Sequence, residues 1–294
     1  MTTVTQLKDK IATRTDKVIT IEEYLAERKS EVNQLLPQNM SIDRFLRVIY
    51  SALRHNPKLA DCTPQSICAA VFQAAQLSLE PNTEGQCYLI PYKNTKIQNG
   101  KKTYVDECQF QIGYKGYIEL FYRHGAALSI DMHSVYENDL FEYGYGTNSY
   151  LKHCPALKDR GEVIAYYAIA MLKNGGSLFK VMSKTECLEH GKRHSKCFIT
   201  KKWDDAARTY IPCEPHFDKN SPWATEFDAM CKKTVLIQLA KLLPKSVALQ
   251  KALAMDCTTK SEIKADMFDV KDETEWGEYP EYNNDLLPQI TAGG

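Results

Sequence analysis

The chain has 294 residues, of which 44% are hydrophobic and 25% are charged, and its 37 basic residues balance its 37 acidic ones. This composition is ordinary for a folded soluble protein with a substantial core. No apolar run approaches a membrane span, and the first ten residues lack the apolar core of a signal peptide, so we expect neither a membrane protein nor a secreted one. The ten cysteines show no disulfide-framework spacing, which favours a reducing cytoplasm.

The charge is unevenly distributed along the chain. Residues 261–294 hold nine acids and two lysines, a net charge of −7, so the rest of the chain carries +7. An acidic segment joined to a basic body is typical of a nucleic-acid-binding core with a flexible arm. We therefore predict an acidic flexible tail over 261–294.

The remaining chain divides into parts of different pattern. Residues 1–20 are polar and patternless, which predicts a disordered N-terminus. A core over 21–260 follows, with a helical part (21–80), a sheet-rich part (81–182) and a second helical part (183–260). We predict an α+β fold, in which an antiparallel sheet with hairpins packs against helices and a long helix lies near the C-terminus.

Two strand-like runs, Gln86–Tyr92 and Tyr104–Ile112, predict a hairpin at the centre of the chain. The Asn99-Gly100 pair between them is a strong turn signal because both residues tolerate positive φ. In the second run Cys108, Phe110 and Ile112 alternate with polar residues that include Gln109 and Gln111. The amide face of this strand meets either water or a polar ligand.

The hairpin leads into Gly113-Tyr114-Lys115-Gly116, and a helix is predicted from Tyr117 to His124, before Gly125. Tyr114 and Lys115 place a ring and a cation at one bend. A lysine neutralises a phosphate and an aromatic face stacks on a base, which is what single-stranded nucleic acid requires. The alternative is that Tyr114 packs in the core and Lys115 is merely solvated.

The second half of the core has three clear features. Residues 162–172 are apolar on both faces, which predicts a central strand covered from two sides. Residues 192–220 form a long basic segment, which we interpret as an irregular insertion. A helix predicted over 222–243 is apolar nearly all round, so Lys232 and Lys233 either reach the surface or bind a phosphate.

Other chemistries find weaker support. Cys187, His190, His194 and Cys197, with Cys213 and His216 downstream, have zinc-compatible spacing, but Gly191 weakens the helix that would hold the two histidines. The carboxylates Glu119, Asp131, Glu137 and Asp139 show no paired spacing that would indicate a nuclease. The sequence contains no Gly-x4-Gly-Lys-Ser/Thr loop, which argues against an ATP-driven recombinase.

Several ordered blocks resemble the RecT family (RecT/Redβ-like) of single-strand annealing proteins. The resemblance covers about residues 35–255, with Ser78 where the family has glycine and Ile237-Gln238 where relatives carry arginines. The blocks are Leu79-Glu80-Pro81, Tyr88-Leu89-Ile90-Pro91-Tyr92, Gln111-Ile112-Gly113-Tyr114-Lys115-Gly116, Lys173-Asn174-Gly175-Gly176, Ser221-Pro222-Trp223, Met230-Cys231-Lys232-Lys233-Thr234 and Lys241-Leu242-Leu243-Pro244.

The resemblance implies ATP-independent pairing of complementary DNA strands on an oligomeric ring or helical filament, without bond chemistry and hence without an enzyme activity. It implies no cofactor, and a divalent cation only as a modulator of DNA binding. Expected partners are single-stranded DNA, annealed duplex DNA, further copies of the chain, a 5′→3′ exonuclease and the host single-strand-binding protein. The expected location is the cytoplasm of a bacterial host, with a phage or prophage origin.

We expect basic side chains to hold the DNA backbone, and the amide-lined face of the second strand and Tyr114 to support the bases. A protein that protects a single strand without annealing it is the alternative, because it would use the same side chains. The set is Gln109, Gln111, Tyr114, Lys115, Arg123, Lys232, Lys233 and Lys241.

Overall fold

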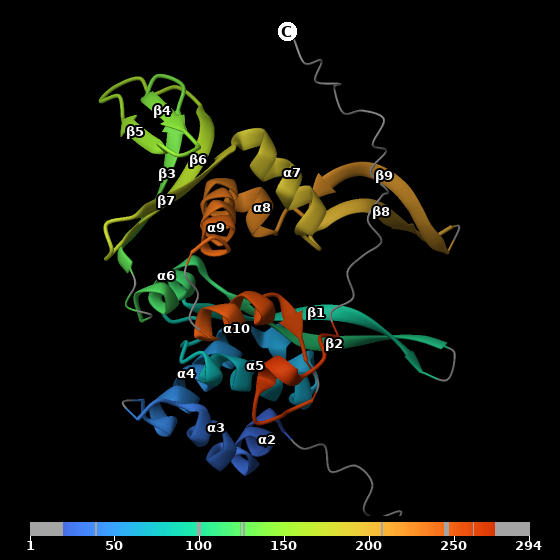
Figure 1. Ribbon diagram of the computed structural model, residues 1–294. Helices are drawn as coiled ribbons and strands as arrows, with labels where there is room; N and C mark the ends of the chain where they lie inside the picture. Colours follow the sequence, from blue (N-terminus) through green and yellow to red (C-terminus); the bar gives the residue numbers. More distant parts are fainter. Residues whose placement is uncertain are drawn as a thin grey trace, which may run out of the picture.

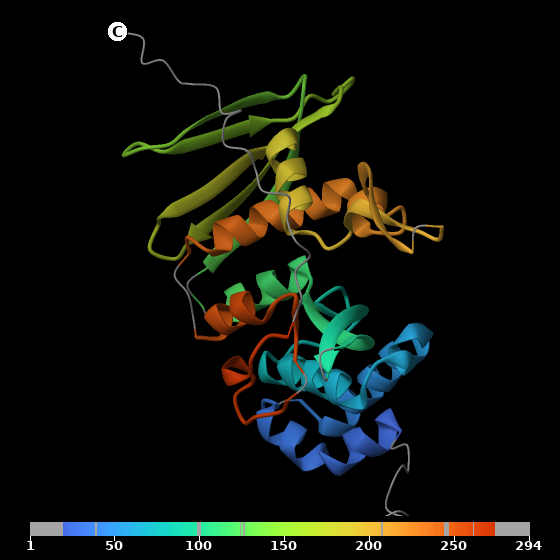
Figure 2. The ribbon, with the colours of Figure 1, turned by 90° about the vertical axis from the view of Figure 1, so that its right-hand side faces the viewer.

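The computed structural model describes residues 20–38, 40–98, 101–123, 125, 127–206, 208–243, 247–260 and 262–273. Helices pack on small antiparallel sheets, which confirms the predicted α+β class. Figures 1 and 2 show two layers: a lower one with the N-terminal helices and the first hairpin, and an upper one with the later strands. The chain crosses from the lower layer to the upper one and then returns, so its last helix packs beside the first hairpin.

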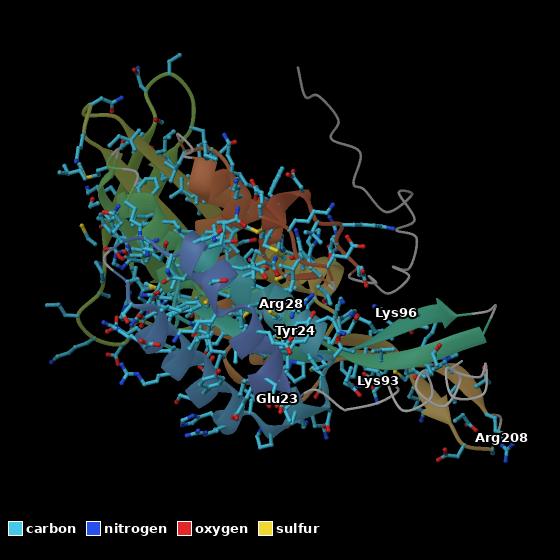
Figure 3. All side chains as sticks on the ribbon, turned by 90° about the horizontal axis from the view of Figure 1, so that it is seen from below. Glu23, Tyr24, Arg28, Lys93, Lys96 and Arg208 are labelled. Carbon is cyan, nitrogen blue, oxygen red and sulfur yellow. The ribbon has the colours of Figure 1, made fainter. Side chains whose placement is uncertain are left out.

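The N-terminal part is helical, as predicted. Its elements are α2 (Ile21–Glu27), α3 (Lys29–Leu35), α4 (Ile42–His55), the 3-10 turn η1 (Pro57–Asp61) and α5 (Pro64–Gln76). The helices α2 and α3 meet at Arg28, whose guanidinium lies 3.9 Å above the Tyr24 ring (Figure 3). Every residue of α5 from Ser66 to Ala75 is buried, so this helix forms the centre of the lower core.

The predicted hairpin is confirmed and is longer than expected. β1 (Cys87–Gln98) pairs with β2 (Lys101–Ile112) along its whole length, and the predicted turn at Asn99-Gly100 lies outside the described residues. Cys108, Phe110 and Ile112 are buried on the side that packs against α5, as their alternation required.

In the upper layer, β6 (Val163–Leu172) lies between β3 (Ala127–Tyr136) and β7 (Ser177–Ser183), which confirms the predicted central strand. The hairpin of β4 (Leu140–Gly144) and β5 (Tyr150–Cys154) packs on one face through Phe141 and Leu151. The helix α9 (Phe227–Ala240) covers the other face. This two-sided burial explains why both faces of β6 are apolar.

The structure corrects the prediction for residues 192–220, which are not irregular. After α7 (Lys184–His194), the strands β8 (Phe198–Asp204) and β9 (Thr209–Phe217) form an antiparallel hairpin with a bulge between Ile199 and Lys201. The sequence of this hairpin shows no alternation of apolar and polar residues, because both of its faces carry polar side chains.

The predicted helix over 222–243 is divided in two. α8 (Pro222–Thr225) is followed by α9, and the break falls at Glu226, whose φ of −134° is not helical. A Cβ on Gly191 of α7 would lie 2.7 Å from the Trp223 ring of α8. Glycine at position 191 therefore lets α7 and α8 pack closely.

Part of the segment expected to be a flexible tail packs on the lower layer. After α10 (Val247–Met255), the two residues of β10 (Thr258–Thr259) add a third strand beside β2, and a short turn η2 (Met267–Asp269) follows. Met267 and Val270 are buried, and Glu273 donates its backbone N–H to the carbonyl of Thr259 over 2.8 Å. The packed body therefore extends at least to residue 273.

This packing predicts a large difference between two truncations. Ending the chain after Lys260 removes the buried Met267 and Val270 side chains and should lower the free energy of unfolding by about 3 kcal/mol or more. Ending it after Glu273 keeps every contact described above and should leave the urea midpoint unchanged. Equal midpoints for the two truncated chains would show that residues 262–273 do not stabilise the fold.

Candidate nucleic-acid interface

One face of the β1–β2 hairpin is polar and turns away from α5. The register places Tyr88 opposite Gln111 and Ile90 opposite Gln109 on this face. Gln109 is only 2% exposed, and its amide nitrogen donates to the carbonyl of Cys257 over 2.6 Å. Gln111 is half-buried and donates to Gln109 Oε1 over 2.9 Å. Gln109 therefore positions the C-terminal segment on β2, and Gln111 is the amide closer to solvent.

The glycines of the central motif set where Tyr114 and Lys115 lie. A Cβ on Gly113 would lie 1.8 Å from the carbonyl oxygen of Gly85, and one on Gly116 would lie 2.2 Å from that of Gln86. Only glycines allow the chain to turn this tightly against residues 85–86. Helix α6 (Tyr114–Arg123) therefore starts three residues earlier than predicted, with Tyr114 and Lys115 in its first turn.

Tyr114 and Lys115 are exposed on the surface, so Tyr114 is not packed in the core, and their DNA contacts stay predictions. Tyr114 is 39% exposed, and Tyr88, which packs over Gly113, is 40% exposed. The Lys115 ammonium has no carboxylate partner in the described part of the chain. A cation is unfavourable at a helix N-terminus, where the dipole is positive, and a bound anion would remove this cost.

Two unpaired lysines lie on α9, which packs against α6. Lys232 and Lys233 are half-exposed, and among the described residues neither ammonium has an ion-pair partner. Both lysines reach the surface, which was one of the two predicted alternatives. Burial raises the pKa of the Cys257 thiol, and the charge of Lys233 opposes that rise.

Arg123 and Lys241 have partners within the chain. The Arg123 guanidinium donates to the carbonyls of Leu77 and Ser78 over 2.8 and 2.7 Å, and to Glu119 over 3.0 Å. These bonds cap the end of α5, so they give Arg123 a structural role. Lys241 is exposed and donates weakly to Gln238 over 3.4 Å. The DNA contacts assigned to both residues stay predictions.

Two residues beside the candidate surface were not among the predicted DNA-binding residues. Tyr88 shares a face with Gln111, and a period-two analysis of β1 would have found it. Lys196 lies 5.3 Å from the centre of the Tyr92 ring, although the two residues are 104 positions apart. No local pattern indicates such a contact, because it arises from the packing of the α7–β8 connection over β1.

The two long hairpins project from the same side of the molecule (Figures 1 and 3). On β1–β2, Lys93 is exposed, whereas Lys96 is bound to Glu107 and Glu273 over 2.6 and 2.7 Å. On β8–β9, basic side chains are exposed at Lys201 and Lys202. Both hairpins therefore carry exposed cations outside the central motif.

The geometry does not support the two alternative chemistries. Within the described ranges, no group of three or more His, Cys, Asp or Glu residues is placed to hold a metal ion, and Cys187 is buried beside Cys231. The four carboxylates considered for a nuclease each bond elsewhere: Asp131 to His133, Glu119 to Arg123, Glu137 to the backbone of Glu162, and Asp139 to Arg160. None of the helices described is long and apolar enough to cross a bilayer.

An exposed combination of aromatic rings and lysines on an α+β scaffold defines a candidate surface for single-stranded nucleic acid. The RecT family model matches residues 43–274, so the chain belongs to the RecT family. It is 33% identical to Protein RecT of Escherichia coli (strain K12) over 229 residues, which cover 78% of this chain and 76% of that protein. It is also 28% identical to the uncharacterized protein YqaK of Bacillus subtilis (strain 168) over 245 residues, 79% of this chain and 74% of that one.

Proposed function

We propose that the chain pairs complementary single strands of DNA without ATP, as an annealing protein of homologous recombination. The observation that carries the proposal is the position of Lys115, Lys232 and Lys233. They lie on two packed helices and have no carboxylate partner among the described residues. Membership of the RecT family supports the same conclusion.

The chemistry of the surface fits this activity. The lysines hold backbone phosphates, each with a contribution of about 0.7 to the salt slope of single-strand binding. Tyr88 and Tyr114 offer exposed ring faces, on which a base stacks for roughly 1–3 kcal/mol. Because stacking uses the faces of the bases, their pairing edges stay open to a second strand. Correct pairing then supplies the free energy, so no nucleotide hydrolysis is required.

The proposal extends to partners and location. Further copies of the chain assemble into a ring or filament that presents one continuous strand. A 5′→3′ exonuclease supplies that strand, and the host single-strand-binding protein is displaced from it. The chain breaks no bond, needs no cofactor and acts in the bacterial cytoplasm, with divalent cations only modulating its hold on DNA.

A strand-annealing assay tests the proposal. Two complementary fluorescent oligonucleotides should form a duplex faster with the protein than without it, in the absence of ATP, and a non-complementary pair should give no signal. Binding that slows pairing would instead identify a strand protector, the second candidate, since that protein would use the same cations and rings.

A further inference from the structure

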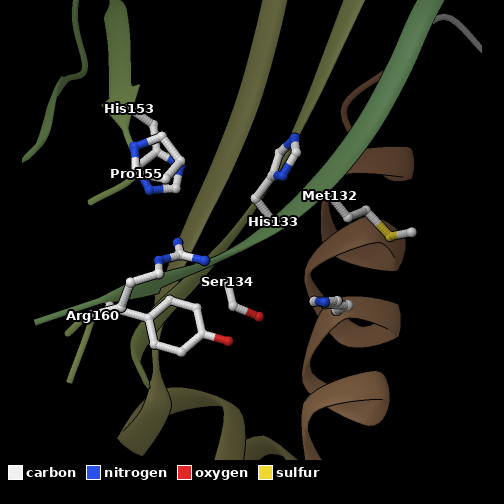
Figure 4. Close-up of a pocket in the computed structure, with 8 residues that line it drawn as sticks. Met132, His133, Ser134, His153, Pro155 and Arg160 are labelled. Atoms are coloured by element: carbon white, nitrogen blue, oxygen red, sulfur yellow. The ribbon is translucent and has the colours of Figure 1, made fainter. Parts of the chain in front are cut away.

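A small polar pocket lies between the upper sheet and α9. Its volume is about 180 Å³, and its lining includes His133, Ser134 and Tyr136 of β3, Arg160 from the β5–β6 connection, and Lys232 of α9. Figure 4 shows the Arg160 guanidinium directed toward the space beside this helix, with His133 and Ser134 of β3 next to it. A pocket of this size is smaller than the usual site for a drug-sized ligand, but it has room for one tetrahedral anion and a few waters.

Arg160 is held rigidly at one wall of the pocket. Its Nε and Nη2 atoms donate to Asp139 over 2.9 and 2.5 Å, and its guanidinium carbon lies 3.9 Å above the Tyr136 ring. Asp139 has no exposed side-chain surface, and the Arg160 guanidinium holds the pKa of this carboxyl well below its usual range. Among the described residues Nη1 of Arg160 has no hydrogen-bond acceptor. Asp139 therefore fixes the guanidinium and leaves one edge for a ligand.

The neighbouring histidines are already bonded. His153 contacts Asp139 through Nε2 over 3.0 Å and Tyr167 through Nδ1 over 3.2 Å. His133 contacts Asp131 over 2.9 Å, so this carboxylate is also engaged. Lys232 on the opposite wall has no ion-pair partner in the described ranges. Two cations from separate elements thus face one polar space.

We propose that this pocket binds a phosphate group between the Lys232 ammonium and the Arg160 guanidinium, with Ser134 as a further donor. Arginine with a free edge and lysine as a point charge are the side chains that suit a phosphate oxyanion. The group is either a phosphodiester of a bound strand or a free phosphate, and the first source rests on the proposed function. Asp139 is a positioning residue, since it acts only through Arg160.

Two variants and one control test the pocket. Lys232→Gln and Arg160→Gln should each weaken binding of a thymidine oligonucleotide about 10-fold and lower its salt slope by about 0.7. The double variant should lose less than the product of the two losses, because both side chains hold one phosphate. Lys152→Gln, an exposed change on β5 outside the lining, is the matched control. Arg160→Lys keeps a positive charge beside Asp139, and its melting temperature shows whether the protein still folds when the guanidinium is replaced.

Inorganic phosphate separates the two sources. If the variants lose affinity for the oligonucleotide and millimolar phosphate does not change the melting temperature of the wild type, the pocket binds a phosphodiester of the strand. A rise in the wild-type melting temperature with phosphate that Lys232→Gln abolishes, with unchanged strand binding, identifies a free phosphate. If folded variants match the wild type in both measurements, the pocket does not bind a phosphate group and the proposal is wrong. Strand annealing by the wild-type protein is measured separately. The proposed phosphate pocket and the proposed annealing function can therefore each fail while the other holds.

Discussion

Replacing Lys115 and Lys233 together by alanine is expected to weaken binding of a single-stranded oligonucleotide on the order of 100-fold at low salt. Each lysine should lose one charge-assisted contact to a phosphate, and such contacts contribute about 1.5–3 kcal/mol. The salt slope should fall by about 1.4, since each single-strand phosphate contributes about 0.7. Fluorescence anisotropy at several salt concentrations measures both quantities.

A control distinguishes this site from general electrostatic attraction. Lys58 is equally exposed on η1, away from α6 and α9, and Lys58→Ala removes the same charge. It should leave the salt slope nearly unchanged. If Lys58→Ala and Lys115→Ala weakened binding to the same extent, the protein would attract DNA through its overall charge, and the surface at α6 would have no special role.

Gly113→Ala is expected to cause the largest loss of stability of any single change discussed here. The added Cβ would lie 1.8 Å from the carbonyl oxygen of Gly85, which is backbone and cannot rotate away. Overpacking of this kind costs about 3 kcal/mol and displaces the start of α6. Urea unfolding measures the loss, and strand binding should fall with it because Tyr114 and Lys115 move.

Gly176→Ala is the matched substitution in a surface turn. There the nearest atom to the new Cβ is the Asn174 side-chain oxygen at 3.2 Å, which can shift. Its unfolding midpoint should stay close to that of the wild type. Equal losses for the two glycine variants would show that close packing against residues 85–86 does not determine the position of α6.

The parts of the fold with strong local patterns were predictable from the sequence. The alternation of Cys108, Phe110 and Ile112 predicted the buried side of β2, and the apolar pattern of residues 162–172 predicted the central strand β6. Thr63 and Pro64 are a further local signal at the start of α5, where the Thr63 hydroxyl accepts a hydrogen bond from the Ser66 N–H. Each of these signals depends on residues that are close in sequence.

The errors arose where distant residues determine the structure. The β8–β9 hairpin has polar residues on both faces, so its strands lacked an alternating pattern. Met267 and Val270 are buried only because α10 returns to the lower layer, which no local feature of an acidic segment indicates. The shared pocket of Arg160 and Lys232 was not predictable for the same reason, since the two residues are 72 positions apart in the chain.

The measurement that tests the central claim most directly is photo-cross-linking of the full chain to a single strand that contains 5-iododeoxyuridine, followed by mapping of the modified peptides. This base reacts with aromatic rings against which it stacks. We predict cross-links at Tyr88 or Tyr114, which Lys115→Ala with Lys233→Ala reduces. Cross-links confined to tyrosines far from the polar face of β1–β2, such as Tyr150 on β5, would contradict the account.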